Sequence, residues 1–355
     1  MGKRAKAGTV LAELVKLAVP LLKAAERDSP RTGPGDKPVV PDWVMAGLIM
    51  ITVLKKKKTK SAQYRFLEEH RRQLAEWLGD AHFPSRATYF RRYRRAHRLY
   101  RAAIRLQGEK ALAEGLAEER DVAVDKSLIE AQGPAWHQRD RARGDVPAGV
   151  DKDSTWGYSE HDGWVQGYSY AVVVTATPGS LVFPLLASVD VASVSEARSF
   201  QREITFLPAG TVNVLADSGY DANYLGEAIE QDENGRRTGR HFLCPENPRN
   251  NKRPKTKPCH ADARRAHSRE VRRRRRKFLK STRGRRLYAR RKKTVEPFNQ
   301  WLKSLFELDQ HVWHRGLDNN RTQMLAAIFA YQLLVRYNHR HGEKNGQICW
   351  ILDKL

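Results

Sequence analysis

Three acidic residues lie where a folded chain could bring carboxylates together. Asp125 stands near the end of an apolar segment in VAVDKSLIEAQG, and Asp217 follows the apolar run TVNVLA. Glu296 lies in TVEPFNQWLK, whose apolar residues recur at helical spacing. Phosphoryl transfer on DNA needs hard oxygen ligands for Mg²⁺, and carboxylates from separate elements supply them. If the fold joins these three acids, it can form such a site.

Each acid also has a structural interpretation. Asp217 could form a turn, Asp125 could cap a strand end, and Glu296 with Lys303, seven residues on, could belong to one polar helical face. The second acid of ADSGYD, Asp221, is expected to cap the start of a helix. The choice between these interpretations depends on the elements that carry the three acids.

The second half of the chain reads as strands followed by alternating strands and helices. We expect strands over 121–127, 164–177, 181–191, 211–217 and 239–245, and helices over 193–205, 221–231 and about 286–308. Pro178-Gly179-Ser180 joins the second and third strands as a hairpin. The strand order predicts antiparallel pairing first and parallel pairing later. Pro297 should kink the last helix or start a new one.

The first 118 residues read as helices. They cover 8–27, 43–54, 61–78 and 86–107, with a Pro- and Gly-rich linker over 29–42. The apolar run Val44–Leu54 is too short to cross a bilayer, which takes about 20 residues, and should be a buried helix. The last of these helices is rich in arginine and follows a short connection, as in a helix-turn-helix. Its candidate DNA contacts are Arg91, Arg92 and Arg95. The alternative is that these arginines only form the solvent-exposed face of a helix whose aromatic residues pack in the core.

The charge of the chain, +25, is concentrated in one segment. Residues 247–293 hold 22 lysines and arginines but only two acids, Asp262 and Glu270. Such a field favours a polyanion, either nucleic acid, including RNA, or an anionic membrane surface. We expect 267–280 to be solvated or disordered until it meets phosphate. The candidate backbone contacts in it are Arg272, Arg273, Arg274, Arg275 and Arg276.

The three cysteines form neither a disulfide framework nor a CxxC pair, which is typical of a reducing compartment. His241 and Cys244 have HxxC spacing, but no second pair completes a zinc site. No secretory signal is apparent, so we expect a cytoplasmic protein.

Four blocks of the sequence resemble the DDE transposases of bacterial insertion sequences, in the group that includes the IS-four and IS-five types. The resemblance runs from about residue 82 to 338 and is carried by DKSLIEAQG (125–133), DKDSTWGYSEHDGWVQGYSYAVVV (151–174), ADSGYD (216–221) and YARRKKTVEPFNQWLKSLF (288–306), followed by RGL at 315–317 and an apolar helix near 323–337. It implies that Asp125, Asp217 and Glu296 are the catalytic metal ligands, for Mg²⁺ with Mn²⁺ as a substitute.

The resemblance also implies a fold and an activity. The fold is α/β (α+β), a ribonuclease-H-like mixed five-stranded sheet with flanking helices, preceded by an all-helical N-terminal DNA-binding region. The activity is Mg²⁺-dependent cleavage of DNA at the element's ends, followed by attack of the freed 3′-OH on target DNA. The partners are double-stranded DNA, as terminal inverted repeats and target, and further copies of the chain; no membrane is involved. A nuclease or resolvase without joining, and a DNA-binding derivative with an unused catalytic centre, stay open as alternatives.

One block departs from the family pattern. The family has Tyr and Arg seven and four residues before its Glu, whereas this chain has Ala289 and Lys292 there. Tyr288 and Arg291 each stand one residue farther out. The candidate phosphate contacts on this helix are Lys292 and Lys303.

These observations predict the following domains: an N-terminal helix and linker (1–41), a helical DNA-binding region (42–118), a catalytic domain (119–341) with a basic insert at about 247–285, and a C-terminal tail (342–355).

Overall fold

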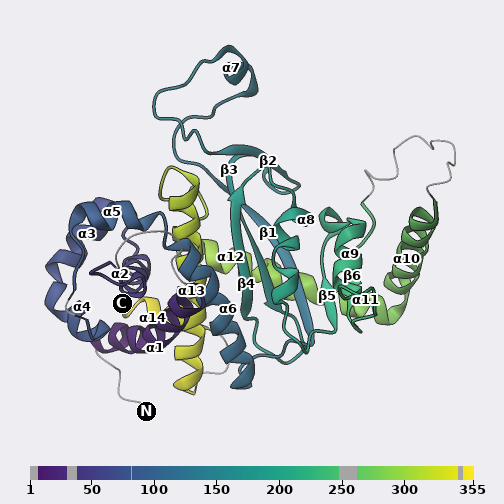
Figure 1. Ribbon diagram of the computed structural model, residues 1–355, viewed down its shortest axis with the longest axis horizontal. Coiled ribbons are helices and arrows are strands. Elements are labelled where there is room, and N and C mark those ends of the chain that lie inside the picture. The colour runs from purple at the N-terminus through teal and green to yellow at the C-terminus, as the bar shows by residue number, and fades with distance from the viewer. Residues whose placement is uncertain (1–6, 30–37, 81, 248–261, 343–346) are drawn as a thin grey trace.

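A mixed sheet lies in the middle of the molecule, with a helical region on one side of it and a long arm of helices on the other (Figure 1). The computed structural model describes residues 7–29, 38–80, 82–247, 262–342 and 347–355; the side chains of 262–269 are outside this description. The strands are β1 (Asp121–Glu130), β2 (Thr155–Ser159), β3 (Gly163–Thr175), β4 (Pro184–Val191), β5 (Asn213–Leu215) and β6 (His241–Leu243).

The sheet has the predicted mixture of pairings. Its order is β2-β3-β1-β5-β6, with β4 also paired to β3. β3 is antiparallel to β1, β2 and β4, whereas β1, β5 and β6 run parallel. The predicted mixed sheet with flanking helices is confirmed, but the count of five strands was one short among the described residues. The additional strand, β2, forms a hairpin with the first residues of β3, and β4 pairs with the remainder of β3.

Helices cover the sheet and form the region before it. Before the sheet they are α1 (Ala7–Asp28), α2 (Asp42–Leu54), α3 (Lys60–Glu69), α4 (Arg71–Leu78), α5 (Arg86–Tyr93) and α6 (His97–Ala113). Within and after the sheet they are α7 (Gln138–Arg143), α8 (Glu196–Gln201), α9 (Asn223–Glu230), α10 (Asp262–Lys280), α11 (Thr282–Tyr288), α12 (Arg290–Leu305), α13 (Leu317–Arg340) and α14 (Cys349–Leu352).

Helix α2 is buried from Trp43 to Leu54, which explains why this segment is apolar on every face. It packs between α1, α6 and α13, and one hydrophobic cluster extends from these helices into the sheet. In the described part of the chain, no helix is long and apolar enough to cross a membrane.

Several helix boundaries differ from those expected. Pro297 lies inside α12 and does not start a new helix. The basic helix expected over 86–107 is broken between α5 and α6, and it continues past Gly108 to Ala113. A Cβ on Gly108 would lie 3.1 Å from the backbone of Leu185 in β4, so this glycine permits α6 to approach the sheet closely. Most of the linker expected over 29–42 lies outside the described residues.

Candidate active site

Asp125 lies in β1, and Asp217 lies level with it just after the end of the neighbouring parallel strand β5. The register pairs Ala123 of β1 with Leu215 of β5, and each aspartate stands two residues beyond its member of that pair. Asp217 caps a short 3-10 helix (Ser218–Tyr220), where its Oδ1 accepts a hydrogen bond of 2.8 Å from the backbone N–H of Gly219. The sheet thus brings both side chains to one point.

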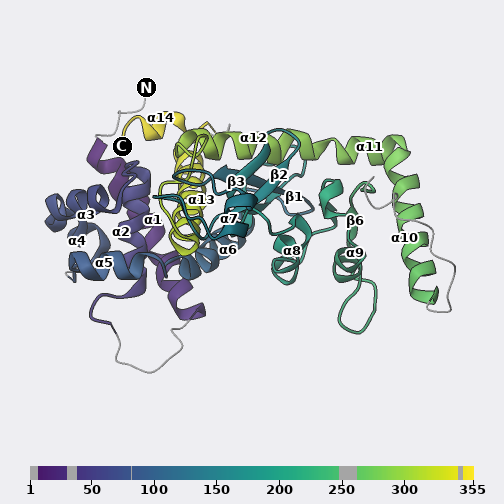
Figure 2. The same cartoon turned by 90° about the horizontal axis from the view of Figure 1, so that it is seen from above.

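Glu296 lies on α12, which runs along the top of the sheet in Figure 2. It is linked to the two aspartates by a shared contact with Arg291 of the same helix. The Arg291 guanidinium donates to Asp125 Oδ1 at 2.8 Å, to Asp217 Oδ2 at 3.4 Å and to Glu296 Oε1 at 3.3 Å. The other Asp125 oxygen accepts a 2.9 Å hydrogen bond from the Asn299 amide. The three acids therefore converge on a single buried guanidinium.

Arg291 was not among the predicted site residues, although a signal for it exists. The buried residues of α12 include Val295, Phe298 and Leu302, and extending this stripe by one turn towards the N-terminus reaches Arg291. Arg291 is 7% exposed and Lys292 is exposed, so the arginine faces the sheet and the lysine faces away from it. Lys292, the candidate phosphate contact, thus lies outside the cluster.

Burial and the mutual repulsion of the acids favour the protonated, neutral form of a carboxyl group in this cluster. Burial raises the pKa of Asp125 to about 6, opposed by the charge of Arg291 and assisted by that of Asp217. Lys303 is also partly buried, which lowers its pKa, while Asp162 and Asp125 act against this. A cation or another proton would relieve the repulsion between these carboxylates.

A fourth acid, Glu196 at the start of α8, lies against Asp217. Burial raises the pKa of Glu196 to about 8, and the neighbouring Asp217 adds to the shift. A Cβ on Gly219 would lie 1.8 Å from Glu196 Oε2, so the glycine of ADSGYD makes room for this carboxyl group. In the sequence, a Glu in a first helical turn reads only as a helix-dipole acid, so this role had no local signal.

Glu196 predicts a pH-dependent stability of the metal-free protein. In the unfolded chain this group loses its proton near its ordinary pKa of 4.5, but the folded protein retains it up to about pH 8. Because the folded state binds more protons between these values, the free energy of unfolding should fall by roughly 2–4 kcal/mol as pH rises through this window. Urea denaturation of wild type and Glu196→Gln at pH 5 and 8 measures it. A pH dependence unchanged in the variant would contradict the assignment.

The arginine-rich segment, expected to be solvated or disordered over 267–280, is helical in α10 and only partly solvated. Arg272 and Arg275 turn inward to Asp221, with nitrogen–oxygen distances of 3.4 and 3.7 Å, and the Arg275 guanidinium lies over the Phe242 ring. The predicted N-cap role of Asp221 is wrong, since Ala222 occupies the N-cap position of α9. Asp221 instead forms ion pairs that hold α10 against the segment that follows β5.

The remaining arginines of this group point outward. Arg273 and Arg274 bind Glu270 at the helix surface, and Arg276 pairs with Glu246. All three are exposed. The basic segment 248–261, with Cys259 and His260, lies outside the described residues, as do the side chains of 262–269.

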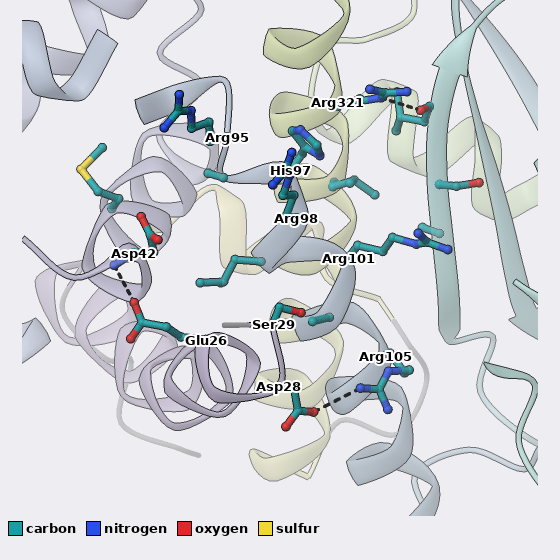
Figure 3. Close-up of a pocket in the computed structure, with 18 of the residues that line it drawn as sticks. Glu26, Asp28, Ser29, Asp42, Arg95, His97, Arg98, Arg101, Arg105 and Arg321 are labelled. Atoms are coloured by element: carbon teal, nitrogen blue, oxygen red, sulfur yellow. Dashed lines mark hydrogen bonds and ion pairs between the residues drawn. The ribbon is translucent and has the colours of Figure 1, made fainter. Parts of the chain in front are cut away.

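The arginines before the sheet line a groove of about 1140 Å³ between α1, α6 and β4 (Figure 3). Arg95 faces this groove, and Arg91 is exposed on α5. Arg92 is committed internally, to the carbonyl of Val40 at 2.5 Å and to the Asp42 carboxylate. None of the three clustered acids lines the groove, so it is separate from the candidate active site.

The carboxylate chemistry suits a divalent cation. Acidic oxygens from β1, from the end of β5 and from α12 are the hard ligands that Mg²⁺ prefers. As the side chains stand, no three His, Cys, Asp or Glu residues within the described ranges are close enough together to hold one metal ion, because the oxygens surround the guanidinium instead. The donor set fits a metal, and its present geometry fits Arg291.

Residues 116–333 match the model of a family described as "Transposase DDE domain". The search of curated proteins found no match, and neither did the search of solved structures. The matched segment contains β1, β5 and α12, and with them all three clustered acids.

Proposed function

The chain belongs to the family of transposases with a DDE domain, and from this membership we propose that it cuts DNA at the ends of an insertion sequence and joins them to target DNA. The observation that carries the proposal is the convergence of Asp125, Asp217 and Glu296 from three separate elements. We also propose that the element belongs to the IS-four/IS-five-like group, that the protein acts as a homo-oligomer on DNA, and that the domains have the predicted boundaries.

In this proposal Asp125, Asp217 and Glu296 would hold Mg²⁺, with Mn²⁺ as a substitute. The bound ions would supply a polarised attacking oxygen and stabilise the leaving oxygen. The chain's own residues orient the ligands: Asn299 holds one Asp125 oxygen, and the Gly219 N–H holds one Asp217 oxygen. Each donor thus fixes one oxygen of its carboxylate beside the cluster.

The test uses purified protein, Mg²⁺ and a DNA fragment ending in the element's own termini. The proposal predicts strand cleavage at those termini, leaving a 3′-OH, followed by joined products in a second plasmid. Cleavage without joined products would favour a nuclease or resolvase. Tight, salt-dependent binding without cleavage in either Mg²⁺ or Mn²⁺ would favour a DNA-binding derivative.

We propose that the outward arginines of α10 contact the DNA backbone. Each phosphate contact contributes about 0.9 to the slope of log K against log salt, so Arg273→Ala/Arg274→Ala/Arg276→Ala should reduce the slope by about 2 to 3. Fluorescence anisotropy between 50 and 200 mM salt measures this change. Lys110→Ala, which removes an exposed charge from α6, should leave the slope within error. An unchanged slope in the triple variant would remove α10 from the DNA interface.

A further inference from the structure

We propose that Arg291 is a built-in occupant of the carboxylate cluster that a divalent cation must displace. The proposal rests on the proposed function, because it concerns the metal which that function requires. It assigns to Arg291 a positioning role in the metal-free protein.

The hydrogen bonds of the two aspartates show why the cation and the arginine compete. Of their four carboxylate oxygens, two accept from fixed donors, Asn299 and the Gly219 N–H. The other two, Asp125 Oδ1 and Asp217 Oδ2, face the same Arg291 nitrogen at 2.8 and 3.4 Å. Both oxygens therefore face the guanidinium whose other terminal nitrogen donates to Glu296 Oε1 at 3.3 Å.

A divalent ion cannot share these oxygens with the guanidinium. Mg²⁺ binds oxygen at about 2.0–2.1 Å and demands near-octahedral geometry, so an ion between the aspartates takes the space of the guanidinium nitrogen. The two positive groups would also repel each other strongly in this buried setting. Metal entry therefore requires that Arg291 leave, whereas Asn299 and Gly219 stay in place.

Arg291 is suited to occupy the space between the carboxylates when no metal ion is bound. It is 7% exposed, and its single guanidinium neutralises part of the charge of three acids, which come from β1, from just after β5 and from α12. Guanidinium groups also form bidentate pairs with phosphate. A DNA phosphate at the cluster would therefore receive the released arginine, which links DNA binding to metal binding.

The experiment measures Mn²⁺ binding to the full chain without DNA, by electron paramagnetic resonance and calorimetry. Arg291→Gln should bind Mn²⁺ at least about tenfold more tightly than wild type. Arg291→Lys, which keeps the charge but loses the fork, should lie between them and serves if the glutamine variant does not fold. Lys293→Gln removes an exposed charge three positions before Glu296 and controls for general electrostatics; it should stay within about twofold of wild type.

Thermal stability gives a second measurement. Without metal, Arg291→Gln should melt below wild type, because three carboxylates lose their shared partner, and Mn²⁺ should raise its melting temperature more than that of wild type. Equal Mn²⁺ affinity of wild type and both Arg291 variants, with binding abolished by Asp217→Asn, would overturn this inference and leave the metal site intact. Absence of Mn²⁺ binding to every variant would overturn the metal site of the proposed function as well.

Discussion

Asp217→Asn is expected to lower the rate of DNA strand cleavage by about 10³-fold or more. The substitution keeps the shape of the side chain and removes one of two adjacent carboxylates that would hold the metal. Several kcal/mol of transition-state stabilisation depend on such an ion, and each 1.36 kcal/mol corresponds to a tenfold change in rate. Single-turnover cleavage of an end-labelled DNA terminus in Mg²⁺ measures the effect.

The variant should remain folded, which separates a catalytic loss from unfolding. Arg291 would retain Asp125 and Glu296 as partners, and an asparagine can still accept the hydrogen bond from Gly219. Asp353→Asn makes the same substitution at an exposed residue near the C-terminus and should cut at the wild-type rate. If Asp217→Asn cleaved as fast as this control, Asp217 would have no part in the chemistry.

The order of the main elements is predictable from the sequence because each carries a strong local signal. The alternating and continuous apolar runs of β1, β3 and β4 and the Pro178-Gly179-Ser180 turn indicate an antiparallel start to the sheet. β2 lacks such a signal: TWGYS has no apolar run, and it is a strand because the first residues of β3 offer it a partner.

The partners of buried charges are much harder to predict. Asp221, Arg275 and Arg291 each lie in a segment that reads as polar or basic surface, yet all three are buried. Their burial depends on pairs formed across 50 or more residues, such as Asp221 with Arg275 and Asp125 with Arg291. Periodicity can show which way Arg291 points, but it cannot show that three carboxylates meet it there.

Glu114→Gln is expected to destabilise the protein by about 3 kcal/mol, because it removes the carboxylate that pairs with a buried guanidinium. Arg336 of α13 is 1% exposed and binds both Glu114 oxygens, at 2.6 and 2.7 Å, and the amide oxygen of Gln107 at 3.0 Å. Urea denaturation followed by circular dichroism and by tryptophan fluorescence measures the change. The glutamine still accepts one hydrogen bond, and the Glu114 side chain is 39% exposed, so the effect lies at the lower end of the range for breaking an ion pair of a buried charge.

Glu109→Gln is the matched control on the same helix. Its carboxylate pairs with Arg105 on the exposed surface of α6, where such pairs contribute about 0.5 kcal/mol or less. Glu114 and Arg336 belong to the predicted DNA-binding region and catalytic domain respectively, and one hydrophobic cluster includes residues of both parts. The two optical signals should therefore shift together in Glu114→Gln. Two separate transitions, with only the helical region destabilised, would mean that this ion pair does not couple the two parts of the chain.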